Sequence, residues 1–306
     1  MLGITVAGTG MKPGLAGREY GIMNEISPVS ISVTVPCERS LTADAAELWQ
    51  VLRIEAQAAS DGEKALARFF DLAVLEQASL NSALAGLLAR KLAEPHMPFE
   101  ALNELVQEAL AGDPGILVSA AADLAAVRAR DPASGSYLTP FLYYKGFHSL
   151  QWHRIGHYLW EHQRQDLAHF LQSRISEVFA VDIHPAVPVG RGVFIDHATS
   201  LVVGETSVIG NDVSILHEVT LGGTGKARGD RHPKVEDGVL LSAGAKVLGN
   251  ITLGRNAKIG AGSVVLHDVP PCATVAGVPA RVVGWCREMV PALDMDQTLP
   301  DYDYVI

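Results

Sequence analysis

The hydrophobic residues of this chain recur with one period in the first half and with another in the second. Between about Thr42 and Ala180, apolar residues stand three and four positions apart, which is the spacing of an amphipathic α-helix. Glycine and proline separate the helical segments, for example at Gly112 and Pro132. Alanine is abundant in these segments and favours helix formation. The pattern predicts an all-α domain.

In the second half, from Val181 onward, an aliphatic residue recurs at every sixth position. Six residues are too few for a helical repeat and do not fit a single alternating strand, but they fit a short strand followed by a turn. Three such units per coil build a triangular prism of parallel β-strands, in which each coil stacks on its neighbour. The step is kept in three registers, which contain Ile183, Val189, Ile195 and Leu201; Val203, Ile209, Ile215 and Leu221; and Val235, Leu241, Val247, Leu253, Ile259 and Val265.

The stretch LGGTGKARGDRHPK, residues 221–234, interrupts this step. It contains four glycines, which permit backbone shapes that other residues resist, and the cationic group Arg231, His232 and Lys234. A solenoid tolerates an insertion at a corner, because a loop there disturbs no strand pairing. We therefore predict a loop that projects from a corner of the prism and carries these side chains away from the core.

Length and charge bound the organisation of the chain. Its 306 residues are enough for two domains, and we divide it into a flexible extension (1–40), a helical domain (41–180), the repeat domain (181–285) and a tail (286–306). An ordered first segment is the alternative for the extension. The formal net charge of −10 argues against nucleic acid or an anionic membrane as main partner. No apolar run reaches the ~20 residues of a spanning helix.

Only three cysteines are present, Cys37, Cys272 and Cys286, and no two of them have CxxC spacing. This fits a reducing cytoplasm and predicts neither a disulfide framework nor a zinc cluster. We therefore expect the three thiols to be inert.

With these features in view, the chain resembles the serine O-acetyltransferases, which begin cysteine biosynthesis. The resemblance implies an α+β fold in which an N-terminal α-helical bundle precedes a left-handed parallel β-helix of hexapeptide repeats. It also implies a cytoplasmic enzyme that transfers acetyl from acetyl-CoA to L-serine without a metal and is inhibited by L-cysteine. The segments that carry it include AVRARDP (126–132), YKGFHSLQWHRIGHYLW (144–160), VDIHPAVPVGRGVFIDHAT (181–199), VVGETSVIGNDVSI (202–215), VTLGGTGKARGDRHPK (219–234), GAKVLGN (244–250), AKIGAGSVV (257–265) and VAGVPARVVG (275–284).

The reaction needs a base, because a neutral serine hydroxyl is a poor nucleophile. Histidine titrates nearest to neutral pH and is the usual choice. By resemblance, His197 is this base, Asp182 is the carboxylate that orients it, and His232 completes the catalytic group. The alternatives are structural: His197 could cap a corner of the prism, Asp182 could contact the helical bundle, and His232 could be a solvated loop cation.

Free serine carries an ammonium and a carboxylate, so its site needs both signs of charge. The resemblance assigns Asp131 and Asp196 to the ammonium. It assigns Arg231, with His232, to the carboxylate, onto which a guanidinium can donate two hydrogen bonds. Asp131 also precedes a proline at a helix end, where Asp is common for turn reasons alone. Two serines, Ser200 and Ser242, stand where the family more often has glycine. The resemblance assigns coenzyme A to Gly223, Thr224, Ala243, Lys258 and Ala261.

Assembly and partners are also implied by the resemblance. Enzymes of this shape form a homotrimer, or a dimer of trimers, with active sites between subunits. The family's terminal isoleucine, here Ile306, inserts its carboxylate into O-acetylserine sulfhydrylase, which is a known mode of recognition. A disordered terminus is the alternative.

Three other functions remain open at this point. The first is a hexapeptide acetyltransferase that acts on a sugar or antibiotic hydroxyl. The second is a prism with a zinc ion held by three histidines, although His184, His197, His217 and His232 include no HxxxxH pair. The third is a platform for assembly without catalysis.

Overall fold

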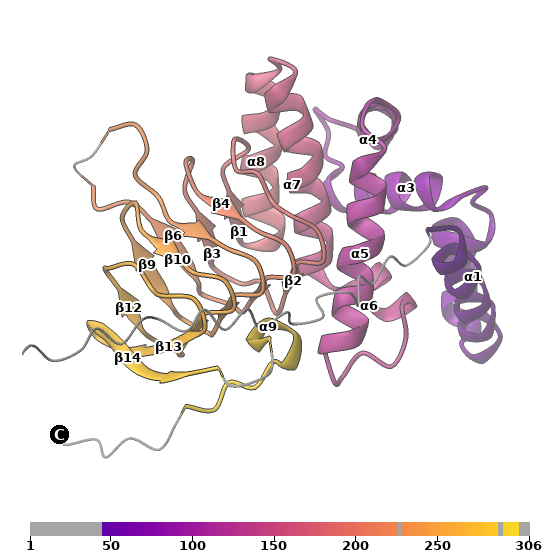
Figure 1. The fold of residues 1–306 in the computed structure, drawn as a ribbon. Coiled ribbons are helices and arrows are strands. Elements are labelled where there is room, and N and C mark those ends of the chain that lie inside the picture. Colours follow the sequence, from indigo (N-terminus) through magenta and orange to yellow (C-terminus); the bar gives the residue numbers. More distant parts are fainter. Residues whose placement is uncertain (1–44, 226–227, 287–289, 300–306) are drawn as a thin grey trace, which may run out of the picture. The chain divides into compact units, whose positions relative to one another are not determined.

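The computed structural model describes residues 45–225, 228–286 and 290–299, which belong to one compact unit. The predicted extension over residues 1–40, including Cys37, and the terminal Ile306 lie outside the described residues. Figure 1 shows a group of helices beside a stack of short strands, in the order that the two hydrophobic periods predict.

The first part of the described chain is helical. The helical stretch between Leu138 and Glu161 is divided in two, because Tyr144 has an extended backbone with φ −83° and ψ 113°. The helices are α1 (Ala45–Gly62), η1 (Lys64–Leu66), α2 (Ala67–Phe70), η2 (Asp71–Leu75), α3 (Leu80–Leu92), α4 (Phe99–Gly112), α5 (Gly115–Arg130), α6 (Leu138–Tyr143), α7 (Lys145–Glu161) and α8 (Gln165–Phe179).

The second part consists of short strands that stack in coils. They form three sheets in the orders β1-β3-β6-β9-β12, β10-β7-β4 and β14-β13-β11-β8-β5-β2, which are the three faces of the prism. Only β13 and β14 pair antiparallel among the described strands. The strands are β1 (Val181–Ile183), β2 (Phe194–Ile195), β3 (Leu201–Val203), β4 (Val208–Ile209), β5 (Ser214–Ile215), β6 (Thr220–Gly222), β7 (Lys234–Val235), β8 (Leu240–Leu241), β9 (Lys246–Leu248), β10 (Thr252–Leu253), β11 (Lys258–Ile259), β12 (Val264–Val265), β13 (Ala273–Gly277) and β14 (Ala280–Trp285).

The six-residue step is confirmed, because its aliphatic residues face the interior of the coils and are buried; only Val189 is partly buried. Strands of successive coils pair 18 positions apart, as Val247 does with Val265. Two corners add residues to this repeat. Ile195 pairs with Ile215, 20 positions away, and Leu221 pairs with Val247, 26 positions away. The second addition is the predicted loop, and both corners contain residues that the resemblance assigns to the site.

A buried ion pair joins the helices to the first coil. Asp123 of α5 is fully buried, and its Oδ2 lies 2.8 Å from Nη2 of Arg154 on α7. Arg154 also donates to the carbonyl oxygens of Val189 and Gly190, and Asp123 accepts from the amide of Val193. A buried charge of this kind must be fully hydrogen-bonded, so the pair fixes the helical domain against the corner over residues 189–193.

The expectation of inert cysteines is wrong for two of the three. Cys272 and Cys286 form a disulfide, with their Cα atoms 5.0 Å apart. They are 14 positions apart, and only the hairpin of β13 and β14 brings them together, which spacing in the sequence does not reveal. Part of the predicted tail is also ordered against the prism, and it includes the short helix α9 (Pro291–Asp294).

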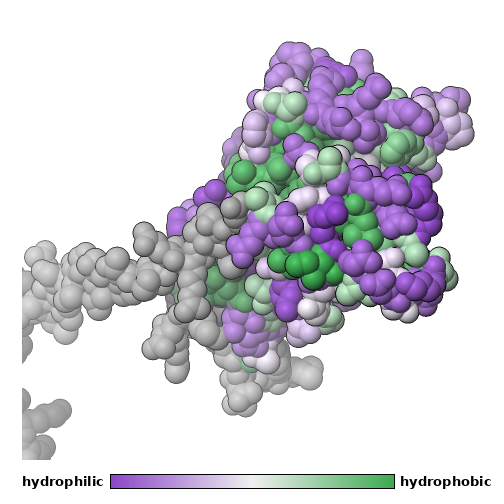
Figure 2. All heavy atoms as spheres, turned by 90° about the vertical axis from the view of Figure 1, so that its right-hand side faces the viewer, coloured by the Kyte–Doolittle hydropathy of each residue, from purple (hydrophilic) through white to green (hydrophobic). Residues whose placement is uncertain are grey.

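The surface of the helical half is mostly polar. Figure 2 shows small apolar areas dispersed among hydrophilic residues on this side. Exposed large hydrophobic residues there include Ile54 of α1 and Val118 of α5. Among the described helices, no single one is long and apolar enough to cross a membrane, and only the bent pair of α4 and α5 meets that test by length and composition.

Candidate active site

The first edge of the prism, defined as the corner over residues 196–200 between β2 and β3, carries Asp196 and His197. His197, Ala198 and Ser200 have φ values of 55°, 60° and 63°. This left-handed corner contains the two residues by which its coil exceeds the regular spacing of 18. The His197 side chain is 75% exposed. His197 Nε2 lies 3.9 Å from Asp196 Oδ1, so the carboxylate beside the predicted base is its own neighbour.

Several acidic and phenolic groups gather at the first edge. Burial raises the pKa of Asp196, His197 counteracts the rise, and the nearby Asp131 carboxylate adds to it. Burial also raises the pKa of Tyr144, and the charges of Asp131 and Asp196 raise it further. The structure therefore brings together the two carboxylates predicted for the serine ammonium, and it places them beside His197.

A column of side chains continues from His197 along this edge. Ile195 pairs with Ile215, Ile215 with Leu241 and Leu241 with Ile259. Two positions beyond each of these residues, the same register aligns His197, His217, Ala243 and Ala261. The column thus joins the predicted base to the two alanines predicted to line coenzyme A.

His217 is the residue of this column that the motif assignments omit. Its ring lies edge-on to that of His197, with centroids 5.8 Å apart, and its Nδ1 is buried without a hydrogen-bond partner among the described residues. Paired positions in these two coils are 20 residues apart, and this spacing places His217 next to His197.

The second edge, between the five-stranded and three-stranded faces, holds the cations of the loop. Arg231 Nη2 donates to Glu205 Oε2 at 2.7 Å. The amide of Thr206 donates to His232 Nδ1 at 3.1 Å, so Nδ1 is the acceptor and Nε2 is left for another partner. A Cβ at Gly204 would lie 2.2 Å from His232 Nε2, so the ring needs a glycine there. Glu205 and Thr206 were not predicted as site residues, although both lie in the segment VVGETSVIG.

Electrostatics at the second edge favours a charged pair beside a neutral imidazole. The hydrogen bond from Arg231 is the main cause of the lowered pKa of Glu205. The pKa of His232 is lowered mainly by burial and further by the positive charge of Arg231. Arg231 is thus held in place by an ionised partner.

Asp182 is the middle residue of β1, on the five-stranded face. Gln172 of α8 donates to its Oδ1 at 2.7 Å, and its charge acts on His184, as does that of Glu205. In the described part of the chain, no hydrogen bond or ion pair links Asp182 to His197. Within one copy, the structure therefore does not bring together the two members of the predicted catalytic pair.

The residues predicted for coenzyme A also lie at separate places. A methyl group at Gly223 would contact His232 Nε2 at 3.5 Å, and Thr224 lies against Gly249. Lys258 is on the six-stranded face, where its Nζ donates to the carbonyl oxygen of Thr298 at 2.5 Å. Burial lowers the pKa of Lys258. The described residues include no cluster of three or more His, Cys, Asp or Glu side chains that could hold a metal.

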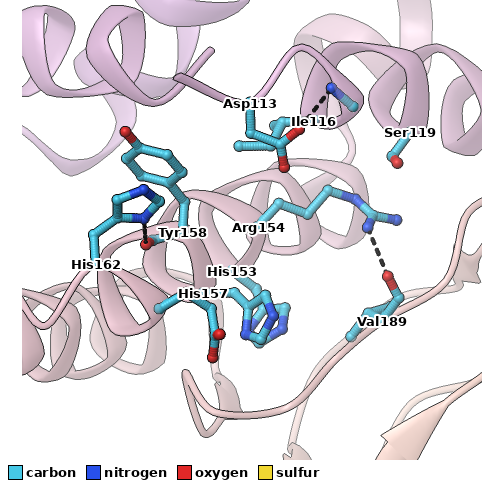
Figure 3. A pocket seen from close by; sticks show the side chains of 11 residues that line it. Asp113, Ile116, Ser119, His153, Arg154, His157, Tyr158, His162 and Val189 are labelled. Carbon is cyan, nitrogen blue, oxygen red and sulfur yellow. Dashed lines mark hydrogen bonds between the residues drawn. The ribbon is translucent and has the colours of Figure 1, made fainter. Parts of the chain in front are cut away.

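A groove of about 450 Å³ lies elsewhere, between α5, α7 and the corner at Val189 (Figure 3). Arg154 and His157 point into it, but Arg154 is committed to Asp123 and to backbone carbonyls, and His157 Nδ1 to the carbonyl of Pro185. None of the predicted site residues lines this groove.

Comparison with known proteins matches both halves of the chain. Residues 48–152 match the family described as "Serine acetyltransferase, N-terminal", and residues 232–267 match "Bacterial transferase hexapeptide (six repeats)". The serine acetyltransferase of Salmonella typhimurium is 56% identical over 263 residues, which cover 86% of this chain and 94% of that protein.

Solved structures agree with this match. A serine acetyltransferase in complex with cysteine has 54% identity and a TM-score of 0.82, and the match covers 84% of this chain and 100% of that one. A serine acetyltransferase in complex with CoA has 55% identity and a TM-score of 0.76, with 78% and 100% covered. The helical domain followed by hexapeptide coils is therefore the fold of a known enzyme family, and the chain belongs to the serine acetyltransferases.

Proposed function

We propose that this chain transfers the acetyl group of acetyl-CoA to the hydroxyl of L-serine, at sites formed where the first edge of one copy meets the second edge of the next. The observation that carries the proposal is the division of the predicted residues. Asp131, Asp196 and His197 lie at one edge, and Arg231 and His232 lie at the other, across the five-stranded face.

In a homotrimer, the first edge of one copy lies next to the second edge of its neighbour. A threefold axis parallel to the prism is a closed, heterologous arrangement, in which each copy presents one edge to each neighbour. Serine then meets carboxylates on one side for its ammonium and Arg231 on the other for its carboxylate. Pairing of two trimers stays a prediction, as does the cytoplasmic location.

In the proposed reaction, His197 removes the proton of the serine hydroxyl. The serine oxygen forms a bond to the acetyl carbon, the carbon–sulfur bond breaks, and coenzyme A leaves as a thiolate that takes a proton. Asp182 of the adjacent copy orients the imidazolium formed at His197, as a carboxylate does in hydrolase triads. His217 faces the thioester, because it stands between His197 and Ala243 in the column.

Coenzyme A is proposed to run along the first edge past Ala243 and Ala261, with Gly223 and Thr224 supplied by the loop of the neighbouring copy. Lys258 is then near its phosphate end. The match with a serine acetyltransferase solved with CoA supports this ligand class.

L-Cysteine is proposed as a feedback inhibitor of the same site. It carries the same ammonium and carboxylate as serine and differs by one atom, so the two charged edges hold both amino acids. The match with the cysteine complex supports this proposal. Binding of O-acetylserine sulfhydrylase through Ile306 stays a prediction, because Ile306 lies outside the described residues.

The test follows the release of free thiol from acetyl-CoA by purified protein, with L-serine and then with other amino acids and sugars. Thiol release that requires serine and is lost in His197→Ala supports the proposal. Turnover with a sugar hydroxyl and none with serine would retain the fold and refute the substrate. Unchanged binding of serine and acetyl-CoA without turnover would identify an assembly platform instead.

A further inference from the structure

One corner of the prism is built from residues in the left-handed conformation. On the six-stranded face, successive coils pair in register at Phe194, Ser214, Leu240, Lys258 and Thr274. The residue two positions before each of these therefore stacks on its counterparts in one column along the corner. The residues of this column are Gly192, Asp212, Gly238, Asn256 and Cys272, with φ values of 69°, 54°, 70°, 58° and 60°.

Cys272 is the exception in this column. Glycine, asparagine and aspartate are the residue types that tolerate a positive φ, whereas other side chains are strained there. Asn256 in the preceding coil shows which type of residue the corner accepts. Strained residues persist where the surrounding structure holds them in place, and at this position the side chain is bonded to Cys286.

The fold positions the two thiols before any bond forms. Cys286 follows the last residue of β14, and its amide donates to the carbonyl oxygen of Cys272 at 2.7 Å. Ala273 pairs with Trp285 in the same antiparallel ladder. Both cysteines are half-buried, and Trp285 beside them is 58% exposed, so a small disulfide can reach them.

The pair sits where the tail segment over residues 290–299 leaves the last coil. This segment returns across the six-stranded face, where Ser214 Oγ donates to the carbonyl oxygen of Ala292 at 2.8 Å and Lys258 Nζ donates to that of Thr298. Met295 packs against the cluster of Ala126, Val127 and Phe194. Figure 1 shows α9 of this segment near the strands of that face. Pro291 and Ala292 of α9 are buried there. The segment begins four positions after Cys286, so the end of β14 sets where it meets this face.

We propose that Cys272 and Cys286 form a redox-controlled clasp that holds the tail segment on the six-stranded face. One thiolate of the pair attacks a small disulfide such as oxidised glutathione, forms a mixed disulfide and releases one thiolate. The second cysteine then attacks the mixed disulfide, the Cys272–Cys286 bond forms, and the second small thiolate leaves. Two electrons pass to the small disulfide, and an excess of reduced glutathione reverses the reaction.

The clasp has a consequence for regulation, and this consequence rests on the proposed function. The tail segment leads to Ile306, the residue predicted to bind the sulfhydrylase. When the clasp is closed, the end of β14 is fixed and the segment stays docked. When it is open, β14 can fray at Cys286 and the segment is released.

The first experiment equilibrates the whole chain in buffers with different ratios of reduced to oxidised glutathione. Free thiols are then alkylated and located by mass spectrometry, and hydrogen exchange is measured over residues 290–299. The variants are Cys272→Asn, which puts an accepted residue type at the corner, and Cys37→Ser, which leaves the pair intact as a matched control.

We expect the wild type and Cys37→Ser to form the Cys272–Cys286 bond in one two-electron step, and exchange over 290–299 to slow several-fold as it forms. Cys272→Asn should exchange rapidly at every ratio. Free thiols at both cysteines in excess oxidised glutathione, or a stable glutathione adduct without the bond, would overturn the clasp. So would exchange over 290–299 that does not change with the ratio. None of these measurements depends on acetyl transfer, so a negative result would refute the clasp and leave the proposed enzyme activity untouched.

Discussion

A mixture of two inactive variants tests whether each active site is shared between copies. His197→Ala removes the base of the first edge, and Arg231→Ala removes the guanidinium of the second. His197→Ala should lose most of its activity, because general bases contribute about 10²–10⁴-fold to rate. Arg231→Ala should also lose most of its activity, because the serine carboxylate loses its guanidinium partner. If every site combines the first edge of one copy with the second edge of the next, some sites in mixed oligomers contain neither substitution.

The expected recovery follows from counting edges. In an equal and random mixture, a site has an intact first edge in half of the cases and an intact second edge in half, so about a quarter of the sites are intact. The same fraction holds for a trimer and for a dimer of trimers, since the shared contact lies within the trimer. The assay is thiol release from acetyl-CoA by protein co-expressed from both genes and purified as mixed oligomers.

The control pairs two variants of the same edge, His197→Ala with Asp131→Ala. Every copy then has a defective first edge, so no intact site forms and activity should stay at the parental level. If the His197→Ala and Arg231→Ala mixture also gives only the mean of the two parents, the site lies within one copy. The proposed arrangement would then be refuted, whatever the oligomeric state.

Three further predictions follow from single contacts. Gly204→Ala should lower kcat/KM for serine strongly with little change in Tm, because its methyl would occupy the place of the His232 ring; an unchanged kcat/KM contradicts the tight packing. Asp123→Ala should lower the free energy of unfolding by about 3–5 kcal/mol in denaturant titrations, since it leaves the buried Arg154 unpaired, and a loss below ~1 kcal/mol would mean that water reaches the pair. Burial lowers the pKa of His148 to about 4, so between that pH and about 6.5 its side chain binds a proton only in the unfolded chain. The contribution of His148 to the free energy of unfolding should therefore fall by about 1.4 kcal/mol per pH unit as pH drops through this window. His148→Gln should remove that contribution, and an equal slope in the variant would assign the pH dependence to other groups.

The sequence predicts the architecture well because the same physical requirement repeats in every coil. Each coil must bury one aliphatic side chain per face, so the step of six from Ile183 to Val265 reports the prism directly. The helical domain is predicted for the same reason, from its period of three and four. The break at Tyr144 is missed, because no glycine or proline lies at that position to mark it.

The site is predicted less completely, because its parts meet only through the fold. Motifs point to His197 and Arg231, and the structure adds that they lie at different edges of one copy. Glu205, which holds Arg231, and His217, which adjoins His197, belong to neighbouring coils and are found only through the strand register. Cys272 and Cys286 are joined by a hairpin, so their spacing carries no signal of the bond.

The geometry of the coils explains why chemistry is confined to the edges. From β1 to β12 the strands are two or three residues long, and an added residue within them would shift the register of every later pair. Corners can lengthen without this effect, and the two that lengthen carry His197 and Arg231. A flat five-stranded face separates these corners, so a single copy cannot enclose an amino acid between them. In the proposed trimer, association is therefore part of catalysis, and dilution that dissociates such a trimer should abolish acetyl transfer while each copy remains folded.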